Sequence, residues 1–225
     1  MDPAFLTAVA DHDTAVVVTP KLFQHSLVSL AREAAQHIVL PEGNDPRVVS
    51  AAAELLMRGL CRVTLLGNPA QVQALAVKLG VSLQGATVLD PHVETTEEMV
   101  SAVYEARKKK GMTREKAREL LEGDENWFGT AMMYLNAADG MVSGACHSTA
   151  ATMRPALQLI KMAPGFNIVS SVFFMLLPTG VKVVGVRVRM RLCARMHACG
   201  QERAMLICAS ASVSWLSPSL LPLTA

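Results

Sequence analysis

The segment "GACHSTAATMRPALQLIK", from Gly144 to Lys161, places hydroxyl groups, a histidine and an arginine directly before an amphipathic helix. The unpaired N–H groups at the start of a helix favour an anion, and an arginine adds a forked donor that is always charged. We predict that Thr152 caps this helix and that Pro155 falls in its first turn. The predicted pocket for a phosphate or a phosphorylated ligand consists of Ser148, Thr149, Thr152 and Arg154.

The same segment also has a simpler structural interpretation. It can be a capped helix with an exposed arginine and a histidine packed at the end of a strand, because hydroxyl-rich helix starts are common. His147 is the weakest candidate, since no acidic residue lies near it in the sequence to orient its ring. The residues alone leave both interpretations open.

Two other charged segments could carry chemistry. Arg107–Lys110 are four consecutive cations near a predicted helix end, where they either stabilise the helix C-terminus or clamp a polyanion such as a nucleotide phosphate. In "LPEGNDPR", a strand-to-helix turn holds Glu42 and Asp45, which we expect to pair with Arg47.

Several familiar sites are missing from the sequence. There is no Walker loop, no G-x-G-x-x-G and no G-x-S-x-G. No metal site is predicted, because the His and Cys residues near the C-terminus lack a repeated C-x-x-C unit. These residues are Cys193, His197, Cys199 and Cys208.

The cysteines, the N-terminus and the hydropathy indicate a cytoplasmic protein without a membrane span. The five cysteines are irregularly spaced, which favours a reducing compartment over a disulfide framework. The N-terminus carries acids before any base, unlike a signal or transit peptide, and no uninterrupted apolar stretch of about 18 residues occurs.

The elements that must position these residues alternate along the chain. Short apolar runs predict strands at 38–40, 63–66, 87–89, 140–144 and 167–177. Helical patterns lie at 22–35, 46–59, 71–79, 95–110, 127–135 and 153–162, with one more starting at Thr113. This alternation predicts an α/β fold with a mostly parallel sheet covered by helices. Ligands in such folds bind beyond the carboxyl ends of the strands, which here places 41–47, 67–69 and 144–154 at the working edge.

The chain divides into three parts by pattern and charge. Residues 1–18 form a leader or linker, residues 19–178 form the α/β domain, and residues 179–225 form a basic tail. The tail has six basic residues against one acid and no clear period, so we expect it to be irregular and poorly ordered. Aromatic residues are not interleaved with its cations, which argues against a nucleic-acid partner.

Three segments resemble the phosphate acetyltransferase / phosphate butyryltransferase family, and are closer to its acetyl members. They are "IVLPEGNDPRVVSAAAELLMRGLCRVTLLGNP", "ARKKKGMT" and "DGMVSGACHSTAATMRPALQLIKMAPGFNIVSSVFFMLLP". The resemblance covers about residues 19–178. It implies a two-domain α/β fold with the active site in the cleft, usually in a homodimer. It also implies the reaction of acetyl-CoA with phosphate to give acetyl phosphate and CoA, without a metal or prosthetic group.

The resemblance also assigns residues. It implies that Arg107, in the "RKxKG" position, and Arg154, in the "TxRP" position, hold phosphate or the phosphate groups of CoA. After Pro178 the family continues with a "YGDCAxN" stretch and later supplies a catalytic Ser-Arg pair and an Asp base, which this sequence lacks. We therefore expect the N-terminal half of a catalytic domain, a truncated acyltransferase with little turnover and unassigned catalytic residues. The alternative is a non-catalytic homologue that only binds phosphate or CoA or serves as an interaction module.

Overall fold

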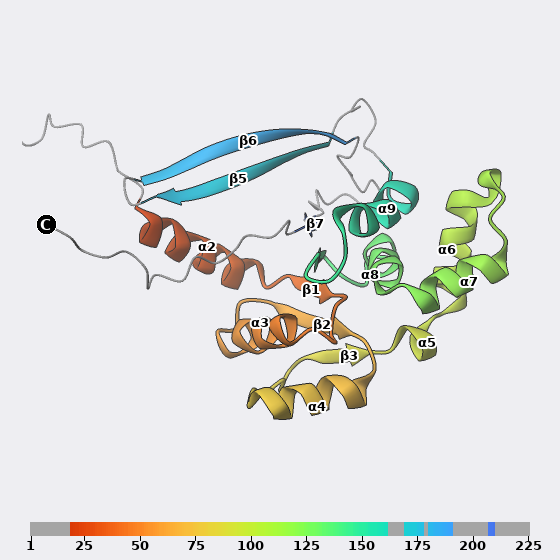
Figure 1. Ribbon diagram of the computed structural model, residues 1–225, viewed down its shortest axis with the longest axis horizontal. Coiled ribbons are helices and arrows are strands. Elements are labelled where there is room, and N and C mark those ends of the chain that lie inside the picture. The colour runs from red at the N-terminus through yellow and green to blue at the C-terminus, as the bar shows by residue number, and fades with distance from the viewer. Residues whose placement is uncertain (1–18, 162–168, 178–179, 191–206, 210–225) are drawn as a thin grey trace, which may run out of the picture.

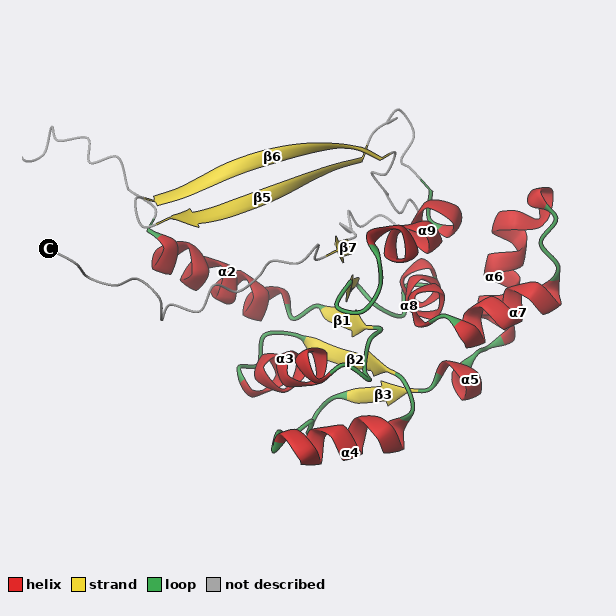
Figure 2. Ribbon diagram, viewed as in Figure 1, coloured by secondary structure: helices red, strands yellow, loops and turns green. Residues whose placement is uncertain are grey.

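The computed structural model describes residues 19–161, 169–177, 180–190 and 207–209 (Figure 1). Five strands form a parallel sheet in the order β3-β2-β1-β4-β7, and two further strands form a separate antiparallel hairpin, β5-β6 (Figure 2). The strands are β1 (His37–Leu40), β2 (Arg62–Leu66), β3 (Thr87–Leu89), β4 (Gly140–Ser143), β5 (Val169–Leu177), β6 (Gly180–Met190) and β7 (Ile207–Ala209).

One helix precedes the parallel sheet, and further helices connect its strands. Four of the helices, α2 to α5, each begin with a proline that follows a side-chain cap, from Thr19, Asp45, Asn68 and Asp90 respectively. A proline is suited to this position because its missing N–H would have no partner there. The helices are α2 (Pro20–Ala34), α3 (Pro46–Met57), α4 (Pro69–Leu79), α5 (Pro91–Glu94), α6 (Glu97–Arg107), the 3-10 helix η1 (Lys108–Lys110), α7 (Arg114–Gly123), α8 (Glu125–Tyr134) and α9 (Thr149–Leu159).

Helices cover both faces of the parallel sheet. Leu40 and Leu65 belong to one core cluster, together with residues of α3 and α4. Their neighbours Val39 and Leu66 belong to the other cluster, with residues of α6, α7, α8 and α9. Successive residues of a strand point to opposite faces, so a strand that is apolar throughout can supply both clusters. The predicted α/β fold with a parallel sheet is thus confirmed.

The strand order reverses at β1. The chain builds β1, β2 and β3 outward in one direction, passes through α5 to α8, and returns with β4 on the other side of β1. Because all these strands are parallel, the loops that follow β1 and β4 lie at the same edge of the sheet. These two loops contain the charged turn and the hydroxyl-rich segment identified in the sequence.

Some boundaries differ from the sequence predictions. Helix α9 begins at Thr149 rather than Met153, and the helix expected at 95–110 starts two residues later and is divided into α6 and η1. Beyond residue 178, where an irregular tail was expected, Gly180–Met190 is a strand that pairs with β5. The leader 1–18 and most of the tail lie outside the described residues, as do Cys193, His197 and Cys199.

Candidate anion-binding site

The carboxyl ends of β1 and β4 are the expected place for a ligand. In open α/β sheets, ligands bind outside the carboxyl ends of the strands at the point where the strand order reverses. Two loops line this point, residues 41–45 after β1 and residues 144–148 after β4. Hydrogen bonds join these two loops directly.

The carboxylate of Glu42 occupies a nest of four consecutive backbone N–H groups. Its Oε2 accepts from Gly144 at 3.1 Å and Ala145 at 2.7 Å, and its Oε1 accepts from Cys146 at 2.7 Å and His147 at 2.9 Å. Successive N–H groups of this kind form a concave anion site. Glu42 is buried, at 6% exposure. The anion in the nest is therefore a side chain of the protein, and the prediction that Glu42 pairs with Arg47 was wrong.

The same carboxylate orients a histidine. Nδ1 of His147 lies 2.8 Å from Oε1 of Glu42, and the histidine side chain is 30% exposed. Burial alone would raise the pKa of Glu42, but hydrogen bonds from Cys146, His147 and Ala145 outweigh it and hold the pKa below the ordinary value of 4.5. Because an ionised carboxylate can only accept, Nδ1 carries a proton. Sequence reasoning missed this acid because it lies 105 positions from the histidine.

A second set of contacts joins the two loops. Oδ1 of Asp45 accepts from Nε of Arg47 at 3.0 Å, and Oδ2 accepts from Nη2 at 2.7 Å. The same Nη2 donates to the carbonyl oxygen of Ala145 at 2.8 Å. The hydrogen bond from Arg47, opposed by burial and helped by one from Cys146, holds the pKa of Asp45 well below its usual range. The predicted pairing of Asp45 with Arg47 is confirmed. The positive charge of Arg47 is therefore already balanced by a carboxylate of the protein.

The start of α9 corrects part of the predicted pocket. Ser148 is the cap, with its Oγ accepting from the N–H of Ala151 at 3.3 Å, and Pro155 lies inside the helix. Thr152 is completely buried, and its Oγ1 lies 3.5 Å from Oγ of Ser143. Thr152 was therefore wrongly predicted as the cap, and its hydroxyl faces the interior rather than an anion at the helix tip.

A buried polar group lies beneath this helix start. Oγ of Ser143 donates to Oδ1 of Asn126 at 2.6 Å, and Oγ1 of Thr130 donates to the carbonyl oxygen of Asn126 at 2.6 Å. The amide nitrogen of Asn126 is buried and has no hydrogen-bond partner among the described residues. These contacts tie α8 to the end of β4. The sequence offered one signal for them, an asparagine directly before the apolar part of α8.

The start of α9 carries exposed groups that could donate to an anion. Arg154 is exposed and makes no ion pair with any described residue. Arg154 is the sixth residue of α9, and side chains on a helix lean toward its N-terminus, which allows its guanidinium to reach the turn that contains Ala150 and Ala151. Thr149 and Ala150 occupy the first two helical positions, where the N–H groups have no intrahelical acceptor. Ser148 and Thr149 are exposed beside them.

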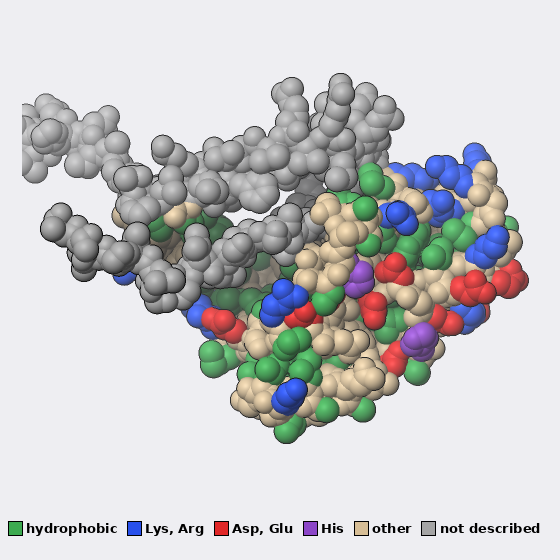
Figure 3. Space-filling model, in the orientation of Figure 1, with side chains coloured by type: hydrophobic (Ala, Val, Ile, Leu, Met, Phe, Trp, Pro, Cys, Tyr) green, Lys and Arg blue, Asp and Glu red, His purple; other side chains and the backbone are tan. Residues whose placement is uncertain are grey.

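Arg107 lies at the end of α6, a helix that packs against α9. Its Nε is buried and has no hydrogen-bond partner among the described residues, whereas the side chain as a whole is half-buried. Lys108 pairs with Glu105, and Lys109 and Lys110 are exposed. Figure 3 shows lysine and arginine side chains gathered over the outer end of α6. The two predicted arginines thus belong to neighbouring helices, with no hydrogen bond joining them.

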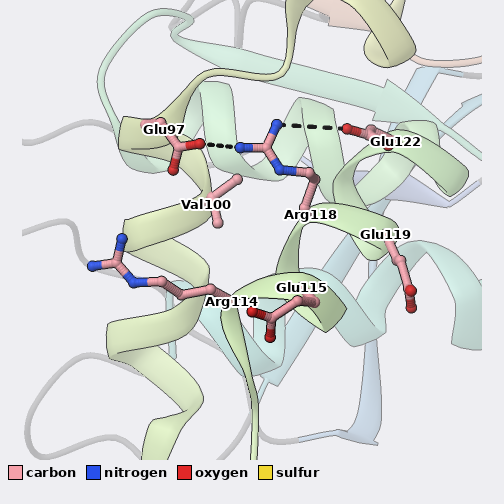
Figure 4. A pocket seen from close by; sticks show the side chains of 7 residues that line it. All are labelled: Glu97, Val100, Arg114, Glu115, Arg118, Glu119 and Glu122. Atoms are coloured by element: carbon pink, nitrogen blue, oxygen red, sulfur yellow. Dashed lines mark hydrogen bonds and ion pairs between the residues drawn. The ribbon is translucent and has the colours of Figure 1, made fainter.

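A pocket between α6 and α7 is unsuited to an anion (Figure 4). Arg118, one of its two cations, lies between Glu97 and Glu122 and pairs with both. Carboxylates outnumber cations in the lining, so the pocket would repel a phosphate. The lining residues are Glu97, Val100, Arg114, Glu115, Arg118, Glu119 and Glu122.

The parallel sheet, the reversal of strand order and the basic helix tip at its carboxyl edge define an α/β protein of the doubly wound class. The sequence profile of the family described as "Phosphate acetyl/butaryl transferase" matches residues 22–186. The chain belongs to this family, as the resemblance predicted. The match ends beyond residue 178, within β6.

Individual relatives agree with the family. The chain is 49% identical over 181 residues to a phosphate acetyltransferase of Escherichia coli, and 45% identical over 172 residues to one of Synechocystis. These matches cover 80% and 75% of this chain, but 25% and 24% of the relatives, so the chain spans about a quarter of their length.

Solved structures of the same kind share the fold. An EutD phosphotransacetylase from Staphylococcus aureus matches with a TM-score of 0.62 and 39% identity, over 71% of this chain and 49% of its own. A phosphotransacetylase from Streptococcus pyogenes matches with a TM-score of 0.59 and 43% identity, over 67% of this chain and 46% of its own.

Within the ranges described, no helix is both long and apolar enough to cross a membrane. The same ranges contain no group of three or more His, Cys, Asp or Glu side chains arranged to hold a metal ion.

Proposed function

We propose that the protein acts in acyl transfer between coenzyme A and phosphate, as acetyl-CoA + phosphate giving acetyl phosphate + CoA. Membership of the family and the names of the relatives support this reaction class. Coenzyme A is then a substrate rather than a bound cofactor, and the partners are small molecules, with a homodimer as the expected assembly.

The observation that carries the proposal is the exposed guanidinium of Arg154, in the second turn of α9. Arg47, in the neighbouring loop, is neutralised by Asp45, whereas Arg154 is exposed and has no described ion-pair partner. A guanidinium and free helix N–H groups together suit a phosphate, because both donate hydrogen bonds toward a concentrated negative charge.

The arrangement also indicates how each group would act. Arg154, with the hydroxyls of Ser148 and Thr149, would hold the attacking phosphate at a fixed position beside the carboxyl ends of β1 and β4. Holding two reactants together turns a bimolecular step into a step within one complex, because most of their translational and rotational entropy is lost on binding. Arg107 and the lysines beyond it would bind a second phosphate group, of the kind that coenzyme A carries.

Binding measurements with single-charge variants test the proposal. We expect phosphate and CoA to bind the wild-type chain in a calorimetric titration, and Arg154→Ala to weaken phosphate binding roughly 10- to 100-fold, the usual cost of a lost charged hydrogen bond. Arg107→Ala should weaken CoA more than phosphate. Arg58→Ala is the matched control, since Arg58 pairs with Glu54 at the far end of α3.

An assay of acetyl phosphate formation separates the two candidate functions. Turnover that falls in Arg154→Ala and not in Arg58→Ala supports the transferase. Arginine-dependent binding of phosphate or CoA without turnover instead supports the non-catalytic binding module. Equal affinities in Arg154→Ala and wild type would rule out the proposed site.

A further inference from the structure

The histidine that Glu42 orients lies directly beside the proposed phosphate site. His147 immediately precedes Ser148, the cap of α9, and its Nδ1 is held by Glu42 at 2.8 Å. Its Nε2 has no hydrogen-bond partner among the described residues, and the ring is partly exposed. A carboxylate that fixes one ring nitrogen and leaves the other free is the arrangement in which histidines act as general bases.

The nest makes this orientation rigid. Glu42 cannot turn away from His147 without giving up four backbone hydrogen bonds, from Gly144 to His147. The backbone N–H of His147 is itself one of the four donors, so the ring and its own main chain are held by the same oxygen. This degree of support exceeds what a surface histidine needs for solubility or packing.

We propose that His147 is a catalytic residue whose Nε2 contacts the phosphate bound at the tip of α9 and accepts its proton, with Glu42 as the positioning residue. This inference rests on the proposed function. Arg154 and the helix tip would hold the anion, and His147 would supply the proton acceptor that is otherwise lacking among the described residues of these two loops. The acids in the loops, Glu42 and Asp45, already accept hydrogen bonds from the protein.

The proton transfer balances without any other reagent. An oxygen of monohydrogen phosphate attacks the thioester carbonyl, and its proton passes to Nε2 of His147 as the new C–O bond forms. The C–S bond then breaks, and the proton passes from Nε2 to the departing sulfur. The products are the acetyl phosphate dianion and the CoA thiol, and the imidazole returns to its neutral form. The Glu42 carboxylate would stabilise the transient imidazolium.

Two substitutions separate this role from a structural one. In His147→Asn, the carboxamide NH₂ takes the position of Nδ1 and can still donate to Glu42, but nothing replaces Nε2. In His147→Gln, a carboxamide reaches the position of Nε2, but it is not basic enough to take the proton from phosphate. If His147 only supports the loop, His147→Asn should behave as wild type in every measurement.

A phosphate titration followed by NMR tests the contact without requiring turnover. We expect the Cε1–H resonance of His147 to shift and saturate with inorganic phosphate, and the shift to disappear in Arg154→Ala. His92, which is exposed on α5, and His37, whose Nδ1 and Nε2 lie 3.0 Å from the Ala137 oxygen and 2.7 Å from Thr64 Oγ1, are internal controls that should not move.

The outcomes distinguish the two proposals. Phosphate binding that depends on Arg154 but leaves the His147 resonance unmoved would overturn the role of His147 and keep the proposed function. Failure of phosphate to bind at all would overturn the proposed function and this role with it. Where the chain turns over, His147→Asn should lower kcat about 100-fold or more, with a smaller change in KM for phosphate and an unchanged unfolding midpoint. His92→Asn should change none of these, and an unchanged kcat in His147→Asn would reject the proton transfer.

Discussion

The thiol of Cys146 donates a hydrogen bond to Oδ2 of Asp45 at 3.0 Å, although the two residues belong to loops that follow different strands. This hydrogen bond, together with burial and the negative charges of Asp45 and Glu42, raises the pKa of Cys146 above its ordinary value of 9.0. Since the thiolate is the reactive form, an exposed cysteine in this setting should react slowly.

We therefore predict that Asp45→Asn increases the rate at which iodoacetamide alkylates Cys146 at pH 8 several-fold. The substitution removes the charge that disfavours the thiolate and leaves the cation of Arg47 nearby. Mass spectrometry of tryptic peptides gives the rate at each site. Cys61, whose pKa is raised by burial alone, is the control and should react at the same rate in both proteins. Equal rates at Cys146 would contradict the assigned hydrogen bond.

Removing the carboxylate from the nest should destabilise the fold. Glu42→Ala leaves four N–H groups, from Gly144 to His147, without their acceptor, and we expect a loss of about 2–4 kcal/mol because water can reach part of the loop. Urea unfolding measures the change. Added formate should restore part of the lost stability in Glu42→Ala, because it can enter the vacated nest.

The control for this rescue is Glu54→Ala. Glu54 is exposed and pairs only with Arg58 among the described residues, so formate should not affect this variant beyond its general salt effect. An identical response of both variants to formate and to chloride would show that the nest has no affinity for a carboxylate.

Stability should decrease in acid because of the same loop. The folded-state pKa values of Glu42 and Asp45 lie below their ordinary values of 4.5 and 3.8, so the unfolded chain binds protons more readily. The contribution of these two carboxylates to the free energy of unfolding is complete above about pH 4.5. It is lost as the pH falls toward their folded-state pKa values. Urea titrations between about pH 7 and pH 3 should show a steeper loss for wild type than for Glu42→Gln. Parallel curves for the two proteins would remove Glu42 as a source of the acid sensitivity.

A glycine beside the nest should tolerate no side chain. A Cβ added at Gly43 would lie 2.4 Å from the carbonyl oxygen of Leu66, which also accepts the N–H of Gly43 at 3.0 Å. Backbone must move to make room, so we expect Gly43→Ala to lose about 3 kcal/mol, at the upper end of the cost of overpacking. Gly123→Ala is the matched control, since a Cβ there meets nothing within 4 Å and helix propensity favours alanine. Thermal unfolding that ranks the two variants equally would contradict this close approach.

Much of the fold could be predicted because its signals are local. The strands β1 to β3 are apolar runs bounded by turn residues, and the prolines at the starts of α3 and α4 mark helix beginnings. The start of α9 could not be predicted in the same way. Ser148 and Thr152 are both good caps, and Pro155 favoured the later one. Thr152 is buried against Ser143, so Ser148 rather than Thr152 caps the helix. This burial depends on how α9 packs on the sheet, which the local sequence does not specify.

The predicted phosphate pocket stays a prediction, and the structure removes one of its members, because Thr152 is buried and is not the cap of α9. The sequence indicated that this loop attracts an anion, and the loop does hold one, but that anion is Glu42. The phosphate site proposed above lies instead at the start of α9, with Arg154. Glu42 and His147 could not be paired from the sequence, because no local rule connects residues 105 positions apart. Asn126 was missed for the same reason, since its partner Ser143 lies on another element.

The bridge between the loops after β1 and β4 has a consequence for the order of folding. Glu42 lies 102 to 105 positions from the residues whose N–H groups it accepts, and the helices α3 to α8 lie between them along the chain. Closing so long a stretch carries an entropy cost that grows with its length, and contacts of high sequence separation slow folding. The bridge can therefore form only after β4 has docked beside β1. In a refolding experiment, the amide hydrogens of residues 144–147 should be among the last to gain protection from exchange.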